Sequence, residues 1–226
     1  MGSSLIQTIA IYALPVIFAI TLHEAAHGYV AKHFGDTTAW RLGRVSLNPI
    51  RHIDPVGTIL VPLVMLVAGG LVGARGLLFG WAKPVPVNFS ALRNPKADML
   101  WVALAGPAAN LAMALIWAAL MKLALSTPAN FFSYPLALMA EKGVQLNIGL
   151  MALNLLPIPP LDGGRVVTSL LPMKLAAPFS RLEPYGIPIL LALIVLPSII
   201  HIDLLQAVLV PPVAALTTLI ERIFQL

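Results

Sequence analysis

Long apolar stretches dominate this sequence and constrain its fold more than any other feature. A helix that spans a lipid bilayer takes about 20 predominantly apolar residues. Charged residues make up only 10% of the 226 residues, and the mean hydropathy is +0.90. Apolar segments near the spanning length lie at about 5–22, 56–73, 98–124, 143–160, 185–200 and 204–220. The sequence therefore predicts an all-α polytopic membrane protein with about six transmembrane helices.

Charge and cysteine content exclude several functional classes. A net charge of +5 would indicate a polyanionic partner for a soluble protein. In a membrane protein, however, Lys and Arg are typical of cytoplasmic loops, so we expect no nucleic-acid partner. The chain contains no cysteine, which excludes disulfides, iron–sulfur clusters and thiolate zinc sites. Any metal must therefore be bound by His, Asp or Glu.

The basic residues predict the orientation in the membrane. Lys32, Arg41, Arg44 and Arg51 follow the first apolar segment closely. Because cytoplasmic loops carry an excess of Lys and Arg, we expect this connection in the cytoplasm and the N-terminus outside. The expected location is the plasma membrane, and a functional site at the end of the first segment would lie toward its cytoplasmic side.

The stretch from about 56 to 87 has to enter the membrane and return, because the connections at 32–51 and 93–96 both read as cytoplasmic. Asp54 and Pro55 are typical of a helix start, as are Asn94 and Pro95 for the next helix. The return at 75–88 is rich in Gly and Pro and reads as extended. Irregular backbone at membrane depth is tolerated only where protein buries it or where it lines a wet cavity. We therefore expect a short re-entrant extended segment beside a cavity.

The spacing of Gly69 and Gly73 is typical of helices in close contact. Packing within one chain is the simpler interpretation. A homodimer with this face at its interface is the alternative.

The strongest chemical signal is His23-Glu24-Ala25-Ala26-His27. Histidines at i and i+4 lie on one face of a helix, where both imidazoles can reach one Zn²⁺, while the glutamate between them is turned aside to act on water. Two buried histidines that bond neighbouring helices are the alternative. Polar groups inside an apolar helix are costly, however, which favours a functional site.

A zinc hydrolase needs a third protein ligand and an open fourth position. Asp162 is the best candidate, because the 143–160 segment that precedes it returns to the depth of His23 and His27. An Asp-Gly turn at a membrane exit is the alternative interpretation of this residue.

Three short motifs, taken in their order along the chain, resemble those of a known family. His-Glu-x-x-His at 23–27 is followed by Ala-Gly-Pro-x-x-Asn at 105–110 and by Asn-x-x-Pro-x-x-Pro-Leu-Asp-Gly-Gly at 154–164. Over about residues 5–170 the chain resembles the site-2 protease family of intramembrane zinc metalloproteases. The resemblance implies one Zn²⁺ per chain on His23, His27 and Asp162, Glu24 as general base, and Asn154 as a residue that holds the substrate backbone.

The resemblance also carries expectations about domains. We expect a single domain over 1–226, with a catalytic core at about 5–170 and a C-terminal helix pair at about 185–224. There is no room for the PDZ or CBS domain that many members of the family carry.

Some polar residues have two interpretations. His52 lies at a predicted membrane entry and is either a further metal or substrate contact or, more simply, an interfacial histidine beside an N-cap. Asn110 and Asn147 lie inside apolar segments. We interpret both as hydrogen-bonding groups between helices rather than as catalytic residues.

The spacing of Pro84 and Pro86 suggests a substrate edge. In an extended strand both missing donors fall on one side, so Lys83, Val85 and Val87 present their N–H groups on the other. That edge could pair with an unwound substrate by strand addition. Two prolines that simply end a re-entrant loop are an equally good account.

The expected activity is hydrolysis of a peptide bond in or near a transmembrane segment of a membrane protein. The alternative is a metal transporter or a metal-binding membrane scaffold, which would also place His, Glu and Asp at membrane depth. A non-hydrolytic scaffold would have no use for Glu24 beside the metal, and the sequence shows no internal repeat of the kind that transporters often have.

Overall fold

The computed structural model describes residues 5–61, 64, 82–186, 188–193 and 204–226. Several expectations fall outside these residues. They are most of the 56–73 segment with Gly69 and Gly73, the part of the re-entrant segment before 82, and the end of the 185–200 segment.

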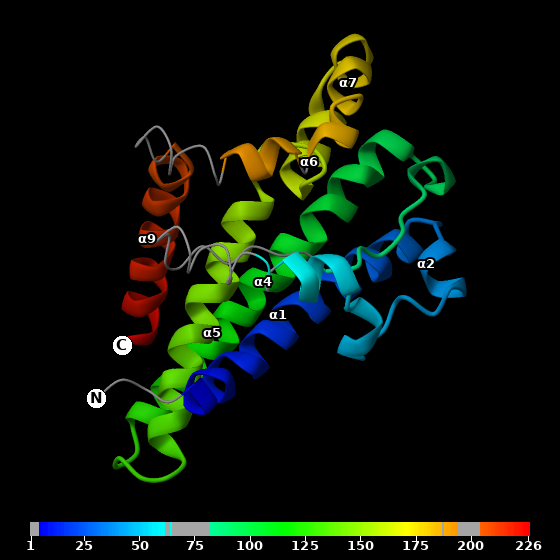
Figure 1. The fold of residues 1–226 in the computed structure, drawn as a ribbon. Helices are drawn as coiled ribbons and strands as arrows, with labels where there is room; N and C mark the ends of the chain where they lie inside the picture. Colours follow the sequence, from blue (N-terminus) through cyan, green and yellow to red (C-terminus); the bar gives the residue numbers. More distant parts are fainter. Residues whose placement is uncertain (1–4, 62–63, 65–81, 187, 194–203) are drawn as a thin grey trace.

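Three long helices form the centre of the molecule. They are α1 (Leu5–His33), α4 (Pro95–Leu125) and α5 (Ser133–Asn154), and each packs against the other two. A fourth long helix, α9 (Leu204–Phe224), lies beside α5 in Figure 1 and contacts both α5 and α4. All four are long and apolar enough to span a membrane. The prediction of an all-α membrane protein is therefore confirmed, while the count of six spans and the re-entrant segment are not.

The shorter elements gather mainly at one end of this bundle. Three follow α1 and one more precedes α4, whereas α6 and α7 follow α5 at the top of Figure 1. Their bounds are α2 (Thr38–Arg41), η1 (Pro49–His52), η2 (Pro55–Leu60), η3 (Phe89–Ala91), α6 (Asp162–Leu170), α7 (Met173–Ser180) and η4 (Glu183–Tyr185). Residues 188–193 are also helical.

The core between α4 and α5 combines small residues, larger aliphatic side chains such as Ile148 and one aromatic ring. Ala114, Ala118 and Ala140 are fully buried, and the two helices approach closely there. Gly143 of α5 lies against Trp117, so closely that a Cβ at Gly143 would be 2.4 Å from the indole ring. Small residues that allow close backbone approach are the usual means of packing helices in a bilayer. The bundle that carries the site is therefore held tightly.

The helix boundaries differ from the apolar runs where local chemistry intervenes. α5 begins at Ser133 rather than near 143, because Pro135 is tolerated in a first turn and Lys142 is paired with Glu141 at 2.8 Å. It ends at Asn154 rather than near 160, because prolines at 157, 159 and 160 cannot continue a helix.

Both predicted helix starts lie where expected, but only one is capped by its own side chain. The Asp54 carboxylate accepts hydrogen bonds from the N–H groups of Val56 and Gly57 at 3.0 and 2.7 Å. Asn94 stands at the N-cap of α4 without a side-chain cap bond. Its own N–H instead donates to the Asp98 carboxylate at 2.7 Å.

Candidate active site

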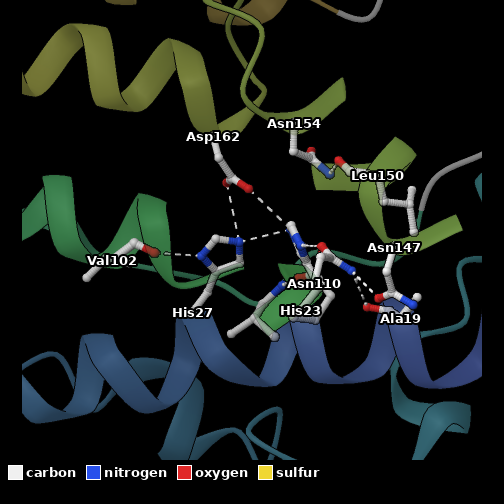
Figure 2. Close-up of polar contacts among 11 residues, drawn as sticks. Ala19, His23, His27, Val102, Asn110, Asn147, Leu150, Asn154 and Asp162 are labelled. Atoms are coloured by element: carbon white, nitrogen blue, oxygen red, sulfur yellow. Dashed lines mark hydrogen bonds and ion pairs between the residues drawn. The ribbon is translucent and has the colours of Figure 1, made fainter. Parts of the chain in front are cut away.

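His23 and His27 project from one face of α1 toward Asp162, the first residue of α6 (Figure 2). Their Nε2 atoms are 3.1 Å apart. The His23 Nε2 lies 3.2 Å from Asp162 Oδ2, and the His27 Nε2 lies 3.3 Å from Asp162 Oδ1. All three side chains are buried. The fold therefore brings together two imidazoles and one carboxylate from opposite ends of the catalytic core.

The other ring nitrogen of each histidine is held by α4. Nδ1 of His27 donates to the Val102 carbonyl at 2.7 Å, and Nδ1 of His23 donates to Asn110 Oδ1 at 2.6 Å. The Asn110 amide nitrogen in turn donates to the Ala19 carbonyl and to Asn147 Oδ1. Because both protons are on Nδ1, both Nε2 atoms carry lone pairs and face the carboxylate.

This arrangement fits a metal ion. Two Nε2 lone pairs and a carboxylate that face one another repel unless a cation lies between them. Asp162 Oδ2 is buried and accepts no hydrogen bond. Within the described part of the chain these are the His, Asp or Glu side chains that could hold a metal, with ligand atoms within 4.8 Å of one another. Two imidazoles and one carboxylate are a donor set of catalytic zinc sites, which keep a fourth position open.

Glycines make the space for this cluster. A Cβ at Gly106 of α4 would lie 2.4 Å from the His27 Nε2 and 2.6 Å from the His23 Nε2. A Cβ at Gly163 would lie 2.2 Å from the Leu155 carbonyl oxygen. Gly106 therefore leaves room for the imidazoles, and Gly163 lets α6 start against the loop after α5, which places Asp162 opposite α1.

A cavity of about 540 Å³ adjoins the cluster, and Glu24 lines it beside both histidines and Asp162. Other lining residues come from the extended segment at 82–85, the end of α5 and the region around η4. The sequence predicts a cavity beside the extended segment, and this one is lined by Ala82, Pro84 and Val85.

Asn154, the last residue of α5, also lines this cavity. Its Nδ2 donates to the Leu150 carbonyl of its own helix at 3.0 Å (Figure 2). Within the described part of the chain the side-chain oxygen accepts no hydrogen bond, which leaves it for other partners.

The described part of the extended segment, 82–88, contains no strand. The Lys83 N–H donates to the His52 carbonyl at 2.9 Å, and the Val85 N–H donates to Glu24 Oε2 at 2.7 Å. Val87 packs on a buried apolar cluster around Ala31. The N–H groups of Lys83 and Val85 therefore have partners within the chain, so a substrate strand would have to replace them.

His52 belongs to the support of this segment. It is 2% exposed, and its Nε2 donates to the Ser46 carbonyl at 2.8 Å. It is not part of the cluster of His23, His27 and Asp162. The interpretation of Asn110 and Asn147 as hydrogen-bonding groups between helices is confirmed by the bond that joins them at 3.0 Å.

Sequence reasoning missed the Val102 carbonyl that orients His27. A backbone acceptor carries no residue-type signal, so only the packing of α1 against α4 reveals it. It also missed the contact of Glu24 with Val85, because a backbone donor leaves no mark on the sequence either.

Comparison with known proteins identifies the family. The Peptidase family M50 model matches residues 127–197. The Bacillus subtilis protein named "Putative zinc metalloprotease YwhC" is 41% identical over 187 residues, which cover 81% of this chain and 80% of that protein. The Mycolicibacterium smegmatis protein named "Putative zinc metalloprotease Rip2" is 27% identical over 184 residues, which cover 81% of this chain and 66% of that protein. No solved structure matches the chain significantly.

The extent of the Bacillus subtilis match decides the assignment, because it covers most of both chains. The His-Glu-x-x-His motif at 23–27 and the cluster it forms with Asp162 agree with the zinc metalloprotease names of these relatives. The chain belongs to peptidase family M50, the site-2 protease family, and is an intramembrane zinc metalloprotease.

Proposed function

We propose that His23, His27 and Asp162 hold one zinc ion per chain and that Glu24 is the general base for hydrolysis of a peptide bond in or near a transmembrane segment. The observation that carries this proposal is the convergence of two Nε2 lone pairs and a buried carboxylate at the wall of a cavity that Glu24 also lines. A zinc ion in this site supplies Lewis acidity, which makes water a stronger acid and polarises the scissile carbonyl.

In this proposal Glu24 transfers the proton during hydrolysis. Glu24 accepts it from the attacking water and later passes it to the leaving amine, so the carboxylate returns to its starting state. Asn110 and the Val102 carbonyl keep the two imidazoles in the tautomer that presents Nε2.

The substrate has to arrive unwound. Carbonyls of a transmembrane helix are hydrogen-bonded within the helix, so the segment to be cleaved must open locally before water can attack. We propose that Asn154 then binds the exposed substrate backbone, since its side-chain oxygen accepts and its amide can exchange the Leu150 carbonyl for a substrate carbonyl. Strand pairing along Lys83, Val85 and Val87 requires the N–H groups of Lys83 and Val85 to leave their present partners.

We propose a single domain with six crossings, its core at about 5–170, the N-terminus outside and the active site toward the cytoplasmic side of the plasma membrane. The position of Lys32, Arg41, Arg44 and Arg51 at and beyond the end of α1 supports this orientation. A homodimer through the 69–73 face stays a prediction, because these residues lie outside the part of the chain that the structure describes. The metal transporter is not favoured, because the relatives carry zinc metalloprotease names.

The test is cleavage of a purified transmembrane test substrate by the protein in detergent, with a chelator and with zinc restored. The proposal predicts cleavage that the chelator abolishes and zinc restores. Metal flux into proteoliposomes without any cleavage would contradict it.

A further inference from the structure

Glu24 is held by a neighbour outside its own helix. Its Oε2 accepts a hydrogen bond of 2.7 Å from the Val85 N–H. Val85 is the one residue between Pro84 and Pro86, and prolines have no N–H to donate. The Val85 side chain is 5% exposed and lies against Gly28, one turn after Glu24 on α1. The backbone donor is therefore docked on the helix face that carries the general base.

The connection between α1 and η2 holds this donor from both sides. Before Val85, the Arg44 guanidinium donates to the carbonyls of Lys83 and Pro84 at 2.9 and 3.3 Å. The Lys83 N–H also donates to the His52 carbonyl at 2.9 Å. After Val85, the Asn88 N–H donates to the buried Asp36 carboxylate at 2.7 Å. We call these three residues, Asp36, Arg44 and His52, the backbone clamp.

The end of α2 directs Arg44 toward the segment. Gly43 has φ +64, a left-handed conformation that glycine adopts without strain. The N–H groups of Gly43 and Arg44 bond back to the carbonyls of Trp40 and Ala39, both at 2.9 Å, in the pattern of a Schellman motif. The Lys32 ammonium, 3.0 Å from the centre of the Trp40 ring, ties α2 to α1. Arg44 thus stands on a turn that is anchored to the catalytic helix.

We propose that Arg44, with Asp36 and His52, is a positioning residue for catalysis: the backbone clamp holds the Val85 N–H against Glu24 and so orients the general base. This inference rests on the proposed role of Glu24. With one carboxylate oxygen bound to Val85, the other is left at a fixed orientation for the proton of the attacking water. Proton transfer depends steeply on such placement, and the donor acts without adding another side chain to the cavity.

The first test compares Arg44→Ala, Arg44→Lys and Arg41→Ala on a transmembrane test substrate. Arg44→Ala should lower kcat by about tenfold, with KM and zinc content unchanged, since a loosened base loses alignment rather than substrate affinity. Arg44→Lys should recover part of the rate, because an ammonium can reach one of the two carbonyls. Arg41, an exposed cation of the same connection, is the matched control and should retain the wild-type rate.

A double-mutant cycle distinguishes an effect of Arg44 through the Val85 N–H from an independent loss of activity. Val85→Pro removes the N–H that reaches Glu24, whereas Pro86→Ala leaves it in place and should be mild. If Arg44 acts through that N–H, adding Arg44→Ala to the Val85→Pro variant should lower its kcat by less than about twofold. Full additivity of the two losses in kcat would overturn the proposal.

Hydrogen exchange of the 82–88 segment gives a readout that does not depend on activity. Because Pro84 and Pro86 carry no amide hydrogen, the signal comes from few amides, among them Lys83, Val85 and Asn88. Arg44→Ala should speed this exchange by about tenfold or more and leave the α4 amides unchanged. Unchanged exchange overturns the backbone clamp. A Glu24→Gln variant with full activity would refute the proposed role of Glu24 as general base. If Glu24→Gln is inactive but Arg44→Ala keeps the wild-type kcat, only the positioning role of Arg44 is refuted.

Discussion

Asn110 of α4 accepts a hydrogen bond of 2.6 Å from Nδ1 of His23 on α1. The same amide donates to the Ala19 carbonyl and to Asn147 of α5, so its orientation is fixed by two further helical contacts. The imidazole of His23 is consequently held by all three central helices. A group that holds the second nitrogen of a metal-binding histidine sets both its tautomer and its direction.

Asn110→Leu should therefore weaken zinc binding by about 10- to 100-fold without unfolding the protein. The reason is loss of the Nδ1 acceptor, which frees the ring to rotate and to change tautomer. Zinc affinity can be measured by competition with a chromogenic chelator. Asn147→Leu should weaken zinc binding less, since Asn110 keeps its bond to the Ala19 carbonyl and its acceptor for His23. Equal zinc affinity in the wild type and Asn110→Leu would contradict the assignment.

A second prediction concerns Gly106, which leaves room for the two imidazoles. Gly106→Ala adds a Cβ within 2.4 Å of the His27 Nε2, so the imidazoles must move and zinc should be lost. Gly149→Ala is the matched control on α5, where an added Cβ meets no atom within 4 Å. Metal analysis of both purified variants checks the prediction. A Gly106→Ala protein with a full complement of zinc would show that the imidazoles do not have to occupy this space.

The zinc ligands themselves are tested by single truncations. His23→Ala, His27→Ala and Asp162→Ala should each deplete the zinc that purified wild-type protein holds at about one per chain. Asp162 is the most informative, because its assignment depends on how α6 follows α5. Retention of all the zinc by Asp162→Ala would remove that residue from the ligand set.

Asn154 separates substrate binding from metal binding. Within the described residues its side chain bonds the Leu150 carbonyl of its own helix, and it lines the cavity, so Asn154→Ala should raise KM by about tenfold and leave zinc in place. The measurement is steady-state cleavage of a transmembrane test substrate together with metal analysis. Loss of zinc from Asn154→Ala would instead give the residue a structural role.

The sequence predicted the parts of this structure that depend on composition and local spacing. The long apolar helices follow from hydropathy, and α4 lies within three residues of its expected start at 98. The approach of His23 to His27 follows from one turn of a helix. Asp162 was expected beside them from its depth and from the family resemblance, and the structure brings it there.

Contacts that depend on tertiary packing escaped the sequence. The role of the 36–52 connection is an example: Arg44 and His52 act through backbone atoms of 83–84, and nothing in their residue types indicates that target. The proposed pairing edge at Lys83 and Val85 is a second example. Alternation gives the side on which the N–H groups of Lys83 and Val85 point, but not whether the chain already bonds them.

The most direct test of the account is a paired measurement on Glu24→Gln, of zinc content and of the cleavage rate of a transmembrane test substrate. Glutamine keeps the shape and the hydrogen-bonding capacity of the side chain but cannot accept the proton. The account predicts wild-type zinc content and a cleavage rate lower by a factor of about 10² or more. Cleavage at the wild-type rate with zinc retained would contradict the proposed mechanism.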